Sequence, residues 1–301
     1  MNALYDNGVR HFLFSYYWIL LMSREEALRK FFRDKPDCHL TLDSGAFSLA
    51  QKAASGKEVP HPREFFARYM DYLKVYGKMW SRIAEPDFDG IDDVDADGNK
   101  VVDVSVEQVD VWRSEMLDTF PHLNIMPVYH AWRGRTAWSE YVNDPRIKCL
   151  AIGRNPPHDG MMRRYVAEAH RAGKPVHGMA MTKFNTLLNW VPFDSADSSS
   201  YLGGQKYGNI YIWQNNHLLN LTKANKGEHR AKAYRAYFRA RGCDPDLVVK
   251  RDPDEVLKCN IRTWLLVGKT FEQLRKQQGM TVGTEPAGES LPFHPPKTRR
   301  A

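Results

Sequence analysis

Short apolar runs alternate with helical patterns along most of the chain. The first run falls within residues 11–21 and predicts a strand, and Ser23 and Glu26 behind it have the spacing of a capping box that opens a helix to about residue 32. Helical spacing of apolar residues predicts further helices within 61–76, 105–120, 138–142 and 161–172. The other predicted strands span 39–42, 79–84, 124–129, 148–152, 174–177, the segment that carries Asp194, and 209–214. Eight strands alternating with helices are typical of an α/β protein with a TIM-like (β/α)8 barrel.

The pattern becomes helical after the last predicted strand. Residues 228–241 predict one helix, which ends at Gly242, and residues 254–278 predict a second one with an apolar face. Beyond Gly279 the composition is typical of a disordered tail. We therefore expect a TIM-like catalytic barrel over 1–221, a basic helical extension packing on the barrel over 222–280, and a disordered tail over 281–301.

The composition indicates a globular protein of the cytoplasm. The 301 residues are 43% hydrophobic and 12% aromatic, enough for a large core. The longest apolar run, 11–22, is too short to span a bilayer and lacks the flanks of a signal peptide, so we expect no membrane association. The four cysteines, at positions 38, 149, 243 and 259, form no CxxC pair and are expected to be reduced thiols.

The net charge of +7 is concentrated at the C-terminal end. Residues 215–301 contain 17 Lys and Arg against 9 Asp and Glu, whereas residues 1–214 contain 26 against 27. This asymmetry indicates a surface that faces a polyanion, most commonly nucleic acid; the alternative is a merely soluble basic surface. The side chains expected to hold phosphates are Lys206, Lys223, Lys226, Arg230, Lys232, Arg235, Arg239 and Arg241.

Two segments place carboxylates directly after predicted strands. Asp43 precedes Ser44 and Gly45, and Asp194 and Asp197 lie in a serine-rich segment. At the C-terminal rim of a barrel such carboxylates suit acid/base and nucleophilic work. From the residues alone, Asp43 could equally cap the next helix, and the serine-rich segment could be only a polar turn.

These segments carry a family resemblance. Leu-Asp43-Ser-Gly-Ala-Phe resembles the Asp-Ser-Gly motif of the tRNA-guanine transglycosylase superfamily, and Phe-Asp194-Ser resembles its nucleophile segment. His177-Gly-Met-Ala180 is similar to its glycine-containing base-recognition loop, and order and spacing agree over roughly residues 10–215. The short chain and the segments 193–201 and 206–208 look most like the phage-type DNA-guanine transglycosylases, with the tRNA enzymes as the runner-up.

The resemblance implies base exchange in DNA, in which guanine leaves and a 7-deazaguanine, such as the 7-cyano form, enters. Asp194 would be the nucleophile that forms a covalent aspartyl-glycosyl intermediate, with Asp197 as the alternative, and Asp43 would be the general acid/base. The target nucleotide must be extruded from a duplex or lie in a single strand. A tRNA-modifying enzyme would use the same residues, and a nucleic-acid-binding barrel without catalysis is the third alternative.

The resemblance also implies a base pocket. A carboxylate can accept two N–H groups from the edge of guanine, and Asp87 or Asp89 fits that role, with Asp87 favoured; the alternative is a turn formed by 86–90. His130 is expected to line the pocket, although a core histidine would fit the same pattern. The remaining expected contacts are Ser44, Gly45, Gly178, Met179 and Ala180.

No redox or nucleotide cofactor is expected, because the chain has no GxGxxG motif and no P-loop. The zinc motif of the tRNA enzymes, Cys-x-Cys-x-x-Cys plus His, is absent from the sequence. Cys243 and Cys259 could retain part of a structural zinc site together with His217 or His229, but the spacing does not assemble four ligands. The sequence makes no prediction of the oligomeric state.

Overall fold

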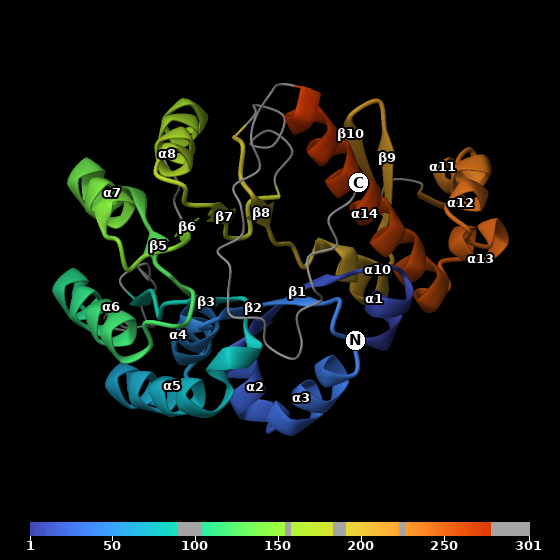
Figure 1. The fold of residues 1–301 in the computed structure, drawn as a ribbon. Coiled ribbons are helices and arrows are strands. Elements are labelled where there is room, and N and C mark those ends of the chain that lie inside the picture. The colour runs from blue at the N-terminus through green and yellow to red at the C-terminus, as the bar shows by residue number, and fades with distance from the viewer. Residues whose placement is uncertain (89–103, 154–157, 183–190, 223–226, 278–301) are drawn as a thin grey trace. The chain divides into compact units, whose positions relative to one another are not determined.

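The computed structural model describes residues 1–88, 104–153, 158–182, 191–222 and 227–277 (Figure 1). The chain forms two units, which are described separately. The sheet unit comprises His11–Met179 and Phe193–Ser195. The C-terminal unit comprises Met1–Arg10, Ala180–Pro192 and the described residues from Ala196 onward.

Parallel strands form the centre of the sheet unit (Figure 1). One sheet has the order β1 (His11–Ser15), β2 (His39–Asp43), β3 (Arg82–Ala84) and β4 (Ile125–Met126). The other has the order β5 (Val128–Tyr129), β6 (Leu150–Ile152), β7 (Val176–Gly178) and β8 (Ser195–Ala196). The structure is therefore of the predicted α/β class with parallel strands, and the described strand pairs do not include one between β8 and β1.

Pro127 separates β4 from β5, because proline has no N–H to donate to a neighbouring strand. The backbone remains paired on both sides of this residue. The N–H of Glu85 donates to the carbonyl of Met126, and the N–H of Ala151 donates to the carbonyl of Pro127. The predicted strand over 124–129 thus joins the two sheets in a single stretch of chain.

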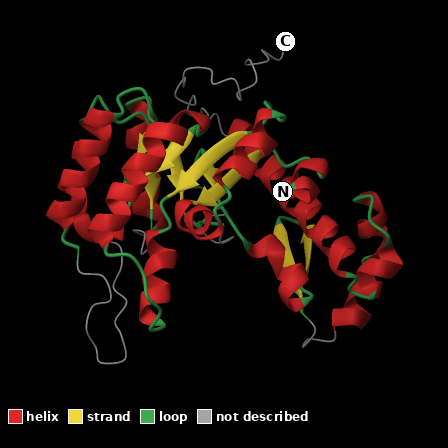
Figure 2. Cartoon of the chain, turned by 90° about the horizontal axis from the view of Figure 1, so that it is seen from below, coloured by secondary structure: helices red, strands yellow, loops and turns green. Residues whose placement is uncertain are grey.

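Helices lie around the strands of the sheet unit (Figure 2). The helices predicted within 61–76, 105–120, 138–142 and 161–172 are confirmed. They are α5 (Pro62–Tyr76), α6 (Val106–Thr119), α7 (Gly134–Asn143) and α8 (Asp159–Arg171). Two short 3-10 turns, η1 (Gly77–Met79) and η3 (Ala131–Arg133), precede β3 and α7. The structure also has α3 (Glu25–Arg33) and a helix that the sequence did not predict, α4 (Ala46–Ala54).

The apolar run at 11–21 is not one strand. Its first part is β1 and its second part is α2 (Tyr16–Met22). An apolar run without alternation does not distinguish a strand from a buried helix segment, which is why the pattern misled here. Ser23 ends α2 in the left-handed conformation, at φ 44°, and α3 follows Arg24 without a side-chain cap, so the predicted capping box is wrong.

The C-terminal unit consists mainly of helices and one hairpin. The predicted strand at 209–214 forms, but it is β9 (Ile210–Gln214), which pairs antiparallel with β10 (His217–Leu221) rather than with a parallel strand. Asn215 and Asn216 both have positive φ, 52° and 58°, as a two-residue hairpin turn requires. The other elements are α1 (Asn2–Asp6), η4 (Ser200–Leu202), α10 (Gly203–Tyr207), α11 (Gly227–Lys232), α12 (Arg235–Ala240), α13 (Pro245–Val249) and α14 (Pro253–Gln277).

The single helix predicted over 228–241 is wrong, because the chain turns between α11 and α12. The N–H groups of Ala233 and Tyr234 donate to the carbonyls three residues before them, which tightens the backbone at this point. The long helix predicted from residue 254 is confirmed as α14. The predicted tail lies outside the described residues.

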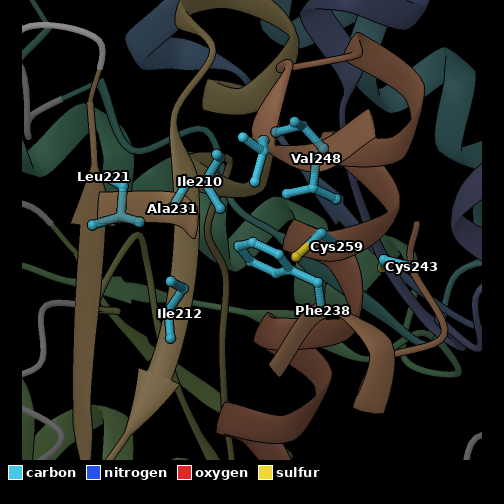
Figure 3. Packing of buried hydrophobic residues seen from close by; sticks show 10 residues of the cluster. Ile210, Ile212, Leu221, Ala231, Phe238, Cys243, Val248 and Cys259 are labelled. Atoms are coloured by element: carbon cyan, nitrogen blue, oxygen red, sulfur yellow. The ribbon is translucent and has the colours of Figure 1, made fainter. Parts of the chain in front are cut away.

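A compact apolar cluster holds the C-terminal unit together (Figure 3). Its members come from the hairpin, α11, α12, α13, α14 and the turn before α13: Ile210, Ile212, Leu221, Ala231, Phe238, Cys243, Val248, Val249, Val256 and Cys259. Side chains also cover the edge of β9 that faces away from β10. Asn260 accepts the N–H of Tyr211, Thr263 donates to the carbonyl of Tyr211, and Tyr237 accepts the N–H of Trp213. The hairpin therefore has no open edge at these positions.

Among the described residues, no helix combines the length and apolar character that crossing a membrane would require.

Candidate functional site

The carboxyl ends of the parallel strands carry polar side chains in the sheet unit. Such ends meet at one edge of a parallel sheet, where α/β proteins commonly place their functional groups. Ser15 and Asp43 end β1 and β2 and are partners in the strand register. Asp87 follows β3, and His130 follows β5. The edge thus brings Asp43, Asp87 and His130, three of the predicted site residues, to one side of the sheet unit.

The segment after Asp43 is packed against the start of α2. Gly45 has a φ of 80°, and a Cβ atom there would lie 2.3 Å from Ser15 Oγ and 2.6 Å from Tyr17 Cβ, so only glycine fits. Gly45 is the N-cap residue of α4, which has no side-chain cap, and Ser44 Oγ accepts the N–H of Ala46. The N-cap position of this helix is therefore Gly45 and not Asp43.

The charges of Asp43 and Asp87 both act on the phenol of Tyr69. The Tyr69 hydroxyl is fully buried and donates to the carbonyl of Ala84 at 2.9 Å. Burial raises the pKa of Tyr69 well above its usual value, and the carboxylates of Asp43 and Asp87 raise it further. The carboxylates of Asp43 and Asp87, which follow neighbouring strands, therefore act electrostatically on the same buried phenol.

Asp87 is paired with a buried histidine. Its Oδ2 lies 3.3 Å from Nε2 of His130, whose side chain is only 1% exposed, while Asp87 itself is 20% exposed. The His130 ring stacks on Trp132, with 4.4 Å between ring centroids. At the end of β6, Gly153 makes room for this histidine, since a Cβ atom there would lie 2.6 Å from His130 Cε1. His130 is thus held in place and leaves one side of Asp87 accessible.

Asp194 is buried and occupied by structural contacts. Its side chain is 2% exposed, and its Oδ2 lies 2.7 Å from His170 Nε2 and accepts the N–H of Val176 at 2.7 Å. These contacts fix the entry into β8 beside β7 and α8. The contacts of Asp194, the predicted nucleophile, are therefore those of a residue that anchors β8 to β7 and α8.

Asp197 is more accessible. Its Oδ1 accepts the N–H of Ala180 at 2.7 Å, which joins the segment after β8 to the predicted base-recognition loop after β7. Ala180 has a φ of 52°, an uncommon conformation for a residue with a side chain. Gly178 is the last residue of β7, and Met179 packs against an apolar cluster in the sheet unit that includes Met126 and Ala151.

A buried polar group that the sequence analysis missed links three strands of the sheet unit. Ser195 Oγ accepts from Nη1 of Arg82 at 2.6 Å and lies 2.8 Å from Nδ1 of His177. Arg82 and His177 are both buried. An arginine within an otherwise apolar strand is the signal that could have revealed this group, because a buried charge needs polar partners.

A second buried network lies behind Asp87. Glu85 accepts two hydrogen bonds from Arg113 and one from the N–H of Val128. Burial raises the pKa of Glu85, and the positive charge of Arg113 opposes that shift. Asp110 bridges Arg113 to Arg133, which fixes the turn that carries Trp132. We assign this network a positioning role.

The predicted phosphate-binding side chains differ in their surroundings. Arg230, Lys232 and Arg239 are exposed on α11 and α12, and Lys206 is exposed on α10. Arg235 pairs with Asp246, and the Arg241 guanidinium lies over the Tyr237 ring, 4.8 Å from its centroid. Asp89, Lys223 and Lys226 lie outside the described residues.

Cys243 and Cys259 are buried in the apolar cluster of the C-terminal unit (Figure 3). A hydrogen bond from Cys243, together with burial, raises the pKa of Cys259, which favours the neutral thiol. His217 and His229 are exposed. Within the described part of the chain, no group of three His, Cys, Asp or Glu side chains is arranged to hold a metal ion.

Comparison of the chain with protein-family models, curated proteins and solved structures finds no match. Function is therefore inferred from the side chains described above and from the sequence motifs that supply them.

Proposed function

We propose that the protein is a guanine transglycosylase that acts on DNA and exchanges guanine for a 7-deazaguanine derivative. The observation that supports this most strongly is the close approach of Asp87 to buried His130, 3.3 Å between Oδ2 and Nε2, at the edge where Asp43 ends its own strand. A partly exposed carboxylate at a strand end suits the N–H groups on the edge of guanine. A second carboxylate, Asp43 at the end of the neighbouring strand, suits proton transfer.

We assign the nucleophile to Asp197 rather than Asp194. The Asp194 carboxylate is buried and bonded to His170 and Val176, and attack would require it to give up these partners. Asp197 is partly exposed, and its bond to the N–H of Ala180 orients it next to the loop that resembles the base-recognition loop.

The proposed reaction has two balanced steps. An Asp197 oxygen bonds to the anomeric carbon as the C–N bond to guanine breaks, and Asp43 delivers a proton to the departing base. The incoming 7-deazaguanine then loses a proton to Asp43, and its nitrogen bonds to the anomeric carbon as the bond to Asp197 breaks. Asp43 thus serves as acid and then as base, and both carboxylates are regenerated.

The test is exchange of radiolabelled guanine into oligodeoxynucleotides and, in parallel, into tRNA. We expect incorporation into DNA, and loss of it in the Asp87→Asn and Asp43→Asn variants with unchanged thermal melting. Incorporation into tRNA alone would instead support the related tRNA-modifying activity. Nucleic-acid binding without exchange into either substrate would point to a binding protein.

The covalent intermediate tests the nucleophile directly. Enzyme incubated with guanine-containing DNA without an incoming base is quenched in acid, digested and mapped by mass spectrometry. The expected adduct is a deoxyribosyl ester on Asp197. An adduct on Asp194 would refute this assignment and leave the overall reaction in place.

A further inference from the structure

Two helices follow the carboxyl ends of β1 and β2 and lie close to the candidate site. They are α2 and α4, which pack against each other in the sheet unit (Figure 1). One face of α2 is buried through Tyr16, Tyr17 and Ile19. The opposite face exposes a large indole, since Trp18 is 45% exposed.

Two lysines gather beside this indole. Lys52 lies with its ammonium group 5.5 Å from the centroid of the Trp18 ring. Gly56 has a φ of 68° and turns the chain so that the N–H of Lys57 donates to the carbonyl of Lys52. The ammonium group of Lys57 lowers the pKa of Lys52, as expected for two like charges held close together. Among the described residues, no ion pair joins either lysine to a carboxylate.

These groups line a shallow surface depression of about 380 Å³. Polar and small side chains complete its lining: Ser48, Gln51, Ala54 and Ser55. We call it the Trp18 depression. It combines an aromatic ring, two uncompensated positive charges and hydrogen-bonding side chains on one surface.

The Trp18 depression is coupled to the segment that carries Asp43. Gly45, two residues after Asp43, is in tight contact with Ser15 and Tyr17, at the junction between β1 and α2. Trp18 is the next residue of α2, and Lys52 belongs to the helix that Gly45 opens. The depression is therefore fixed to the same backbone as the proposed general acid/base.

We propose that the Trp18 depression binds single-stranded nucleic acid next to the nucleotide that reacts, with a base stacked on Trp18 and a phosphate on Lys52 and Lys57. This inference rests on the proposed function. It extends that function, because the phosphate contacts expected from the sequence belong to the C-terminal unit, whereas the Trp18 depression belongs to the sheet unit. Stacking on an aromatic ring combined with a positive groove is the usual way to hold a single strand without reading its sequence. It would hold the strand while one nucleotide is extruded.

An anionic membrane surface is the competing partner, since Leu21 and Met22 on α2 are also exposed. The position of the lysines favours nucleic acid. Lys52 on α4 lies over the ring, and Lys57 lines the same depression from the turn after α4, which suits stacking and phosphate contact together. A membrane-surface helix instead carries its basic residues along its own polar face.

The experiment measures binding of a fluorescein-labelled 20-nucleotide single strand to the full chain by anisotropy at several salt concentrations. We expect Trp18→Ala to weaken binding about tenfold and Trp18→Phe to retain most of it. Lys52→Ala/Lys57→Ala should weaken binding and reduce the slope of log Kd against log salt by about 1.4, the value for two phosphate contacts to a single strand. The matched control, Lys30→Ala/Lys78→Ala, removes two exposed lysines whose positions precede β2 and β3, and should change neither quantity.

Guanine exchange and vesicle binding separate the possible outcomes. If the wild type binds and exchanges guanine while the Trp18 and lysine variants match the control, the Trp18 depression is not a binding site and the proposed function stands. If the wild type neither binds nor exchanges, both proposals fail. Binding to phosphatidylserine vesicles that is lost in Trp18→Ala, with strand binding unchanged, would assign the surface to a membrane. Melting curves of every variant exclude loss of folding.

Discussion

Substitutions of Asp194 and Asp197 are expected to differ in their effects on stability and on guanine exchange. Asp194→Ala leaves the N–H of Val176 and the ring of His170 without their acceptor, so we expect the free energy of unfolding to fall by about 2–3 kcal/mol. Asp197→Asn keeps an oxygen for the N–H of Ala180 and should destabilise the protein less than Asp194→Ala does. Urea unfolding measures both effects, and guanine exchange should be abolished only in Asp197→Asn. A stable, inactive Asp194→Ala protein would reverse these roles.

Gly153 supports the position of His130. In Gly153→Ala the new methyl group would overlap His130 Cε1 and Val128 Cγ1, so the histidine must shift and its position relative to Asp87 must change. We expect a loss of about 1–3 kcal/mol in stability and a rise of the KM for guanine. His130→Ala provides room for the methyl group, so the stability losses in the Gly153→Ala/His130→Ala double variant should be less than additive. Additive losses would contradict the packing described here.

The sequence predicted these residues unequally. Asp43, Asp87 and His130 directly follow apolar runs, and the rule that strand ends share an edge was enough to group them. The different surroundings of Asp194 and Asp197 depend on His170 and Ala180, which belong to other elements. The polar group formed by Arg82, His177 and Ser195 likewise requires three strands to be in register, which spacing along the chain does not reveal.

At the scale of elements, α2 and α5 pack against each other within the sheet unit through buried tyrosines. The rings of Tyr16, Tyr69 and Tyr72 pack against one another, and burial raises the pKa of Tyr16 to about 12 and those of the other two further. In the unfolded chain these phenols ionise near pH 10, about two units below Tyr16 in the fold. Their contribution to stability is therefore fully present below pH 10 and is lost as the pH rises through 12.

Urea midpoints measured between pH 8 and pH 11.5 test this expectation. The midpoint should be insensitive to these groups up to about pH 10 and then fall, and the fall should be smaller in Tyr16→Phe, which cannot ionise. An equally steep fall in that variant would exclude a contribution from Tyr16.

Asn260 connects α14 to the hairpin and the segment before it. This fully buried side chain accepts from the N–H of Tyr211 and donates to the carbonyls of Asn209 and Tyr201. Asn260→Leu removes all three bonds at similar volume, and we expect it to destabilise the protein by about 3 kcal/mol. Gly268→Ala is the matched control on the same helix: its methyl group meets nothing within 4 Å, and it should stabilise α14 by about 0.5–1 kcal/mol. Urea unfolding compares the two, and equal stability would contradict the role given to Asn260.

The type of most helices was predictable, because their apolar spacing is regular over several turns. The predictions failed for the pairing of strand 209–214 and for the single helix over 228–241, where packing of side chains decides the structure. The strand predicted over 209–214 pairs within a hairpin instead of with a parallel strand, because the Asn215–Asn216 turn returns the chain along it. The break between α11 and α12 carries neither proline nor glycine at 233–234, and it serves the packing of Tyr237 and Phe238 on β9 and α14.

At the scale of the whole molecule, the C-terminal unit includes the first ten residues of the chain. Asn7 Oδ1 accepts from Nε of Arg262 on α14 at 2.9 Å, and Gly8 faces Leu265 of the same helix. Deleting residues 1–9 should therefore loosen α14, although the deletion lies more than 240 residues away in sequence. Hydrogen exchange of the α14 amides should accelerate, while those of α5 stay protected. Unchanged exchange in α14 would refute this role.

This division of the C-terminal unit also affects how the chain folds during synthesis. Residues 1–10 are synthesised before the sheet unit, and their partners on α14 are synthesised only after it. During synthesis α1 therefore lacks its partners on α14 until that helix has been made. The strands of the sheet unit, in contrast, are all present once residue 196 has been added. Contacts so distant in sequence form slowly because a long loop must close first. We expect the sheet unit to acquire its structure early and the C-terminal unit to complete the fold last.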